Sequence, residues 1–92
     1  MKVESTLLDA YVGANVVLDV MGPYIYLGQL ERYDHKYAVL IDADVHDMRD
    51  STSTRERYVS ETRQHGITSN RNQVLVSLDQ MVSISRLDDV VG

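Results

Sequence analysis

Three side chains that can bind metal ions recur at every second position near the middle of the sequence. They are Asp42, Asp44 and His46, and in an extended strand this spacing places all three on one face. Carboxylate oxygens and imidazole nitrogens are suitable ligands for Mn, Zn or Mg ions. The same spacing is typical of the solvated face of an amphipathic strand, and we favour that second interpretation. We therefore expect no metal and no cofactor.

Other arrangements that would indicate catalysis are missing from the sequence. There is no cysteine to act as a nucleophile or thiolate ligand, and no serine lies in a G-x-S-x-G elbow. The five glycines occur singly and build no phosphate-binding loop; they are Gly13, Gly22, Gly28, Gly66 and Gly92. The function that we expect is therefore not that of an enzyme.

The composition of the 92 residues is that of one globular domain spanning 1–92, with 43% hydrophobic and 25% charged side chains. Nine Lys and Arg residues against fourteen Asp and Glu give a net charge of -5. This balance argues against a protein that coats nucleic acid by charge alone. No apolar run approaches the roughly 20 residues of a membrane span. We expect a cytoplasmic protein without a membrane partner.

Positive charge is concentrated in residues 46–72, which are also rich in Ser and Thr and poor in aliphatic side chains. This segment holds five of the nine basic residues, namely Arg49, Arg55, Arg57, Arg63 and Arg71. We interpret it as a polar insert between the third and fourth strands, either a loop or a solvent-exposed hairpin extension. Mixed charge of this kind is usually solvated surface, but its arginines also offer a place where RNA could be held.

The hydrophobic pattern predicts a short N-terminal helix followed by five strands. Leu7, Leu8 and Tyr11 recur at helical spacing over about two turns, and Gly13 is suited to end the helix. Alternating or β-favouring runs then predict strands over 14–20, 24–33, 37–45, 73–78 and 81–86. Successive strands without intervening helices favour an antiparallel sheet, which at this length should curl into a small, strongly bent, SH3-like barrel. The predicted fold class is mostly β.

Two residues within this pattern have specific conformational roles. Gly28 interrupts the long strand 24–33 and indicates a bend, a bulge or a close approach of two backbones. Asp34 and His35 predict a tight turn in which the Asp34 carboxylate can bond to the backbone. The last two strands are short and leave an open edge, which a neighbouring subunit could cover by strand addition.

The stretch 7–42 resembles the first motif of the Sm and Sm-like family, and this motif covers about 40% of the chain. The matching residues have the spacing of that motif without a gap; they are Leu8, 11–13, Val16, Leu18, Gly22, 28–30, 33–34 and 39–42. The resemblance implies an N-terminal helix and a bent five-stranded barrel, assembled into rings that bind RNA. It also implies a nucleic-acid-binding site on two turns, formed by Asp34, His35, Lys36, Tyr37, Ser77 and Asp79.

Four positions depart from the family's pattern and weaken the expected uridine-type pocket. Lys36 stands where a base-stacking side chain is common, and Ala38 where an asparagine commonly contacts the base edge. Ser77 replaces the expected arginine, and Leu78 replaces the expected glycine. Such contacts are each worth about 1–3 kcal/mol, so losing two or three of them weakens uridine-type binding by orders of magnitude. His35, Lys36 and Tyr37 still offer a cation and two ring faces there.

The resemblance further implies a closed ring of about five to eight copies of the chain. The fifth strand of one copy would pair with the fourth strand of the next, and the expected seam residues are Val74, Val76, Leu78, Met81, Val82 and Ile84. We therefore expect a subunit of a homo-oligomeric ring that binds single-stranded RNA or takes part in an RNA-associated assembly. The alternative, which the acidic net charge favours, is a structural or protein-interaction ring with little or no RNA affinity.

Overall fold

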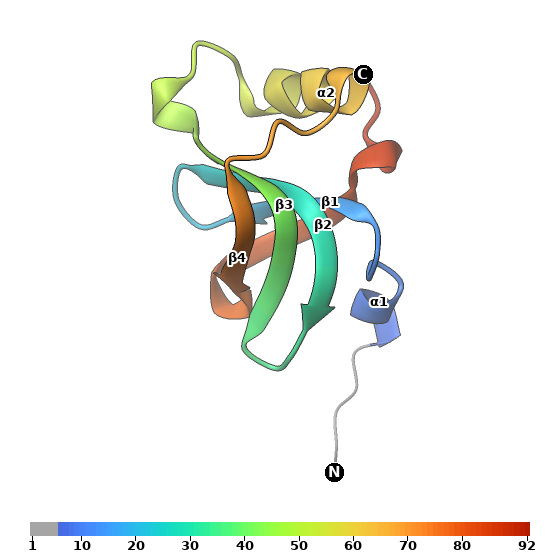
Figure 1. Cartoon of the computed structure of the whole chain (residues 1–92). Helices are drawn as coiled ribbons and strands as arrows, with labels where there is room; N and C mark the ends of the chain where they lie inside the picture. Colours follow the sequence, from blue (N-terminus) through green and yellow to red (C-terminus); the bar gives the residue numbers. More distant parts are fainter. Residues whose placement is uncertain (1–5) are drawn as a thin grey trace.

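The structure is a computed structural model and describes residues 6–92 of the chain. Its central feature is a five-stranded antiparallel sheet (Figure 1). The helices and strands are α1 (Thr6–Asp9), β1 (Asn15–Val20), β2 (Tyr24–Tyr33), β3 (Tyr37–Asp47), α2 (Arg55–His65), β4 (Arg71–Ser77) and β5 (Met81–Arg86). The strand order is β4-β3-β2-β1-β5, and every neighbouring pair is antiparallel. The mostly β fold with a short N-terminal helix is confirmed.

The predicted barrel is an open, bent sheet rather than a closed one. Strand β4 pairs only with β3, and β5 pairs only with β1, so these two strands form the opposite edges of the described sheet. The single 3₁₀ turn Leu78–Gln80 connects them. Each edge therefore keeps a row of backbone groups that do not take part in the sheet's own strand pairing.

The bend in β2 depends on Gly28, as the sequence predicts. The pairing of β2 with β3 shifts in register between Leu27 and Gln29. A Cβ atom added to Gly28 would lie 3.0 Å from the Cβ of Ala43 and 3.1 Å from the carbonyl oxygen of Ile41. Real side chains do not approach this closely without displacement, so the glycine allows the two paired strands to lie this close together.

The inner face of the bent sheet encloses the main hydrophobic core, to which all five strands contribute. Its buried residues are Val16, Leu18, Leu30, Ala38, Leu40, Ala43 and Val76. Met81 and Ile84 of β5 pack against them from the edge of the sheet. Because this core touches both edge strands, the curvature of the sheet is fixed within a single chain.

The N-terminal helix α1 is shorter than the predicted two turns and ends at Asp9. After it, Gly13 adopts a φ of 90° and its amide donates a 2.7 Å hydrogen bond to the carbonyl of Leu30 in β2. The guanidinium of Arg86, at the end of β5, lies 5.1 Å from the centre of the Tyr11 ring. Because so short a helix is not stable alone, these contacts fix its position on the sheet.

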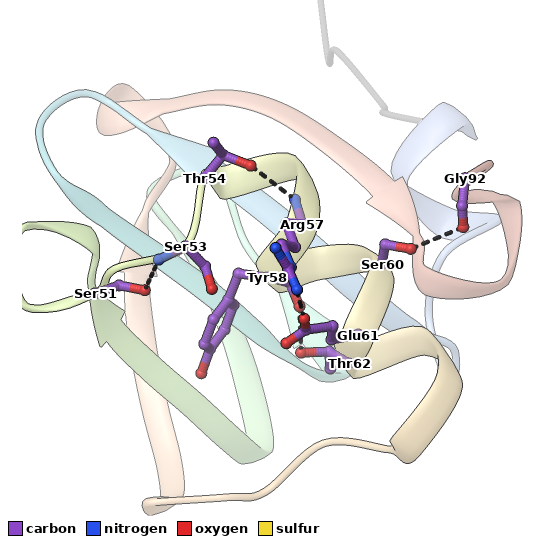
Figure 2. Close-up of polar contacts among 9 residues, drawn as sticks. All are labelled: Ser51, Ser53, Thr54, Arg57, Tyr58, Ser60, Glu61, Thr62 and Gly92. Carbon is purple, nitrogen blue, oxygen red and sulfur yellow. Dashed lines mark hydrogen bonds and ion pairs between the residues drawn. The ribbon is translucent and has the colours of Figure 1, made fainter.

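The insert between β3 and β4 spans residues 48–70 and contains an α-helix, so the prediction of a loop or a hairpin extension is wrong. Figure 2 shows how α2 begins: the Thr54 hydroxyl accepts a 3.2 Å hydrogen bond from the amide of Arg57. Arg57 then pairs with Glu61 one turn later at 3.0 Å. No helix among the described residues has the length and apolar character that would carry it across a membrane.

Helix α2 covers a second hydrophobic core on the outer face of the sheet. Val17 of β1 and Ile25 and Leu27 of β2 point to this face and pack against Val59 of α2, which is 7% exposed, and Leu87. The sheet is therefore covered on both faces where β1 and β2 run. The insert is part of the packing of the domain and cannot be removed without exposing these side chains to water.

Candidate nucleic-acid interface

The turn between β2 and β3 is held by the carboxylate of Asp34. One oxygen, Oδ1, accepts hydrogen bonds from the backbone amides of Lys36 and Tyr37, each at 2.7 Å. The amide of Asp34 in turn donates to the carbonyl of Tyr37 at 2.9 Å. The Lys36 amide, followed by that of Tyr37, holds the pKa of the Asp34 carboxyl below its usual range. The predicted bonding of Asp34 to its own turn is confirmed.

This turn lies directly against the turn between β4 and β5. The amide of Leu78 donates a 2.8 Å hydrogen bond to the carbonyl of Lys36, and Ser77 is the register partner of Tyr37. The structure therefore brings the two predicted groups of site residues together at one end of the sheet. Four of them have exposed side chains on the first turn, namely Asp34, His35, Lys36 and Tyr37. Asp79 is exposed on the second turn, and Ser77 is half-buried.

Sequence reasoning missed a shallow groove of about 200 Å³ beside these turns, on the outer face of the sheet. Tyr37 and Asp34 line it together with four residues that the prediction did not include, which are Arg32, Tyr33, Val39 and Leu75. Leu75 is the register partner of Val39, so its position in the groove follows from the strand pairing. The unbroken apolar run 74–76 was the available signal, because it indicates a strand with apolar side chains on both faces.

The groove and the turns combine cationic side chains with an exposed aromatic ring. Lys36 is exposed and can attract phosphate, while the Tyr37 ring offers a surface for stacking against a base. Arg32 is also exposed, but its guanidinium pairs with the carboxylate of Glu31, which reduces the attraction that it offers to phosphate. Ala38, by contrast, is buried in the core, so this position offers nothing to a ligand. The arrangement is suited to sequence-tolerant contacts with a single strand rather than to base-edge recognition.

The arginines of the insert are less available to a nucleic acid than their number indicates. Arg49 pairs with Asp47 at 2.7 Å, Arg55 with Asp19 at 2.8 Å, and Arg57 with Glu61. Helix α2 also lies at the end of the molecule opposite to the β2–β3 turn (Figure 1). The acidic partners neutralise these three cations, which weakens the case for the insert as an RNA contact.

The predicted seam residues occupy three different environments. Val74, Leu78, Met81 and Ile84 are half-buried and pack against the main core. Val76 is buried inside the chain's own fold, where its side chain faces the same core. Val82 is 69% exposed on β5. On β4 the most exposed apolar side chain is Leu75, at 53%, which the prediction left out.

The residues Asp42, Asp44 and His46 do not share one solvated face, and that interpretation of their spacing is wrong. Asp42 has a φ of 49°, which interrupts the alternation of the strand. Asp44 is only 5% exposed and accepts hydrogen bonds from Tyr58 and Asn70. His46 stacks on the Tyr58 ring, with 4.3 Å between the ring centres. In residues 6–92 no three His, Asp or Glu side chains are arranged to hold a metal ion.

Comparison with known proteins identifies the fold. The sequence matches no family model and none of the curated proteins. Among solved structures, the chain is similar to an Sm protein of Pyrococcus abyssii, whose structure was determined in complex with a uridine heptamer. The similarity has a TM-score of 0.60 at 16% sequence identity, and it covers 90% of this chain and 99% of that chain. The chain described here therefore has an Sm-like fold.

Proposed function

We propose that the chain is a subunit of a closed homo-oligomeric ring of about five to eight copies. In this ring β5 of one copy pairs with β4 of the next. The observation that supports it is the strand order, which leaves β4 and β5 as the two edges of the described sheet. A head-to-tail contact uses one edge from each copy and satisfies both, so repetition around an axis leaves no edge open.

The turns that carry Lys36 and Tyr37 then bind single-stranded RNA. The hydrogen bond from Leu78 to Lys36 supports this role, because it places both candidate turns at one end of each subunit. The Sm protein with the similar fold is in complex with a uridine heptamer. Binding of uridine runs is weak here, since the buried Ala38 and the short Ser77 replace side chains that could contact a base. The role is one of binding rather than of catalysis.

A ring with a purely structural or protein-binding role is the second candidate. The net charge of -5 per subunit favours it, because this charge accumulates around the ring and repels phosphate. The ion pairs of Arg49, Arg55 and Arg57 point in the same direction. The two candidates differ in one measurable property, which is the affinity for an oligonucleotide at low salt.

A titration with labelled U-rich and A-rich oligoribonucleotides separates these candidates. If RNA binds, the affinity should fall steeply as salt rises, because each neutralised phosphate releases counterions. The double variant Lys36→Ala with Tyr37→Ala should lose the binding. Arg63→Ala, which removes an exposed cation from the inserted helix, serves as the control and should retain it. An absence of binding at low salt would exclude the RNA role and leave the structural ring.

A further inference from the structure

A pocket of about 190 Å³ lies on the outer face of the sheet, beside the free edge of β5. Its lining includes Val17 of β1, Asp19, Arg55 and Val59 of α2, Ser85 of β5, and Val90. We call this pocket the socket. Val17 and Val59 are almost completely buried and form an apolar floor. The inserted helix therefore builds one wall of a hollow that opens next to the free edge of β5.

The rim of the socket is polar and already fixed within the subunit. Arg55 donates a 2.8 Å hydrogen bond to one carboxylate oxygen of Asp19, and Ser83 donates a 3.0 Å bond to the other. Ser83 and Ser85 are the register partners of Asp19 and Val17 and share their face of the sheet. Because both serines are short, the outer face of β5 leaves the socket open along the strand edge. The Arg55 ion pair holds the position of α2 above it.

The opposite edge of the sheet presents a protruding leucine. Leu75 is 53% exposed on β4, and its neighbour Val76 is buried in the core on the inner face. Since side chains alternate along a strand, Leu75 stands on the outer face, which is the face that carries the socket. An exposed leucine on an edge strand whose outer side has no partner is an apolar surface that association would bury.

We infer that Leu75 of one copy inserts into the socket of the next, so that the inserted helix takes part in the assembly seam. The inference rests on the proposed ring and identifies the contact that determines its register. In an antiparallel pair of β4 and β5, the register that sets Leu75 opposite Ser85 also sets Ser77 opposite Ser83, within the bounds of both strands. Both partner residues on β5 are short serines, so the outer face of this edge leaves room for the leucine.

A leucine that packs into this socket contacts apolar side chains from two elements of its neighbour. Val17 comes from the sheet and Val59 from α2, so each copy contributes its insert to the binding of the next copy. The polar rim of Arg55, Asp19 and Ser83 surrounds that contact and keeps its own hydrogen bonds. This arrangement resembles the energetic core and polar rim that are common in protein interfaces.

The first test is the molar mass of Leu75→Ser, measured by light scattering over a range of concentrations without RNA. The concentration at which the assembly dissociates should rise at least about tenfold, because each seam loses a buried leucine side chain. Leu7→Ser is the matched control, since Leu7 is 85% exposed on α1, and it should assemble like the wild type. Circular dichroism and thermal unfolding check that both variants are folded.

The second test uses two variants with complementary defects. Ser85→Leu blocks the socket but keeps Leu75, while Leu75→Ser keeps the socket but lacks the leucine that fills it. At a concentration where the wild type is assembled but Leu75→Ser is dissociated, each variant alone should be monomeric. In a mixture, Leu75 of a Ser85→Leu molecule can fill the open socket of a Leu75→Ser molecule, but no second intact seam can form between them. The mixture should therefore contain a one-to-one heterodimer and no ring.

Four results would overturn the inference. If Leu75→Ser assembles like the wild type, the socket is not filled by Leu75, and the proposed ring still stands with another contact. If Leu7→Ser weakens assembly equally, the effect of Leu75 is not specific. If the wild-type chain itself is monomeric, the proposed ring fails, and the inference fails with it. A mixture of the two variants that stays monomeric would contradict the complementary fit.

Discussion

The hydroxyl of Tyr58 donates a hydrogen bond to the buried carboxylate of Asp44 and so joins the inserted helix to strand β3. Asn70 donates a second bond, of 3.3 Å, to the other oxygen of the same carboxylate. A carboxylate that is only 5% exposed needs such donors to offset the loss of its water. These two bonds, together with the apolar contact of Val59, make the insert a fixed part of the domain.

The change Tyr58→Phe should lower the free energy of unfolding by about 1–3 kcal/mol, because it leaves one oxygen of a buried carboxylate without its donor. The aromatic ring remains and can still stack on His46. A denaturant titration followed by circular dichroism measures the difference. Tyr24→Phe is the control, since the Tyr24 side chain is exposed, and it should change the stability by less than about 0.5 kcal/mol. Equal stability of Tyr58→Phe and the wild type would contradict the role of the hydroxyl.

Alkaline pH should act on the same contact. Burial, and after it the hydrogen bond to Asp44, raise the pKa of Tyr58 above its ordinary value. The folded protein therefore holds the neutral phenol more strongly than the unfolded chain does. This contribution to stability is complete below the ordinary tyrosine pKa and is lost as the pH rises through the raised value. In an alkaline titration followed by tyrosinate absorbance, the wild type should show an ionisation step above the ordinary tyrosine range that is absent from Tyr58→Phe. Identical titration curves of the two proteins would contradict the raised pKa of Tyr58.

The change Asp34→Ala should loosen the turn between β2 and β3, because it removes the acceptor of two backbone amides. Hydrogen exchange of the Lys36 and Tyr37 amides, followed by NMR, should become faster, and Asp34→Asn should keep part of the protection through its remaining carbonyl oxygen. Since the pKa of Asp34 is lowered, the stabilising contribution is present above the usual range of Asp and is lost as the pH falls through the lowered value. Unchanged exchange in Asp34→Ala would show that the carboxylate does not hold the turn.

The change Gly28→Ala should lower the free energy of unfolding by about 1–3 kcal/mol, because the added methyl group meets strand β3. The nearest atom is the Cβ of Ala43, at 3.0 Å. Combining Gly28→Ala with Ala43→Gly removes that atom and should recover part of the loss. Thermal or chemical unfolding of the three proteins provides the comparison. A stable Gly28→Ala protein would mean that the strands do not approach as closely as described.

The sequence was sufficient to predict the sheet, because its strands have clear patterns and end at recognisable turns. The predicted strands 24–33 and 81–86 agree with the observed bounds of β2 and β5. Helix α2 was missed because only Val59 is fully buried in it, so no apolar periodicity marks it. The weaker signals were present in Thr54 as an N-cap and in the i,i+4 pair of Arg57 and Glu61.

The environments of single residues were harder to predict than the strands that carry them. Asp44 is buried because α2 supplies Tyr58, and a strand pattern alone gives no information on a helix that covers it. Val76 faces the core of its own chain, so a charge at that position would unfold the chain and could not report on the proposed seam. Leu75 is the residue that tests assembly without this complication, because half of its surface is exposed in the isolated chain.

The molar mass of the wild-type chain in dilute solution, measured by light scattering and by native mass spectrometry, tests the central claim most directly. The free edges of β4 and β5 predict one closed species with a mass of about five to eight times that of the single 10.4 kDa chain. Its mass should stay constant over a wide range of concentrations. A particle of 10.4 kDa at every concentration tested would contradict the ring, and with it the seam between β4 and β5.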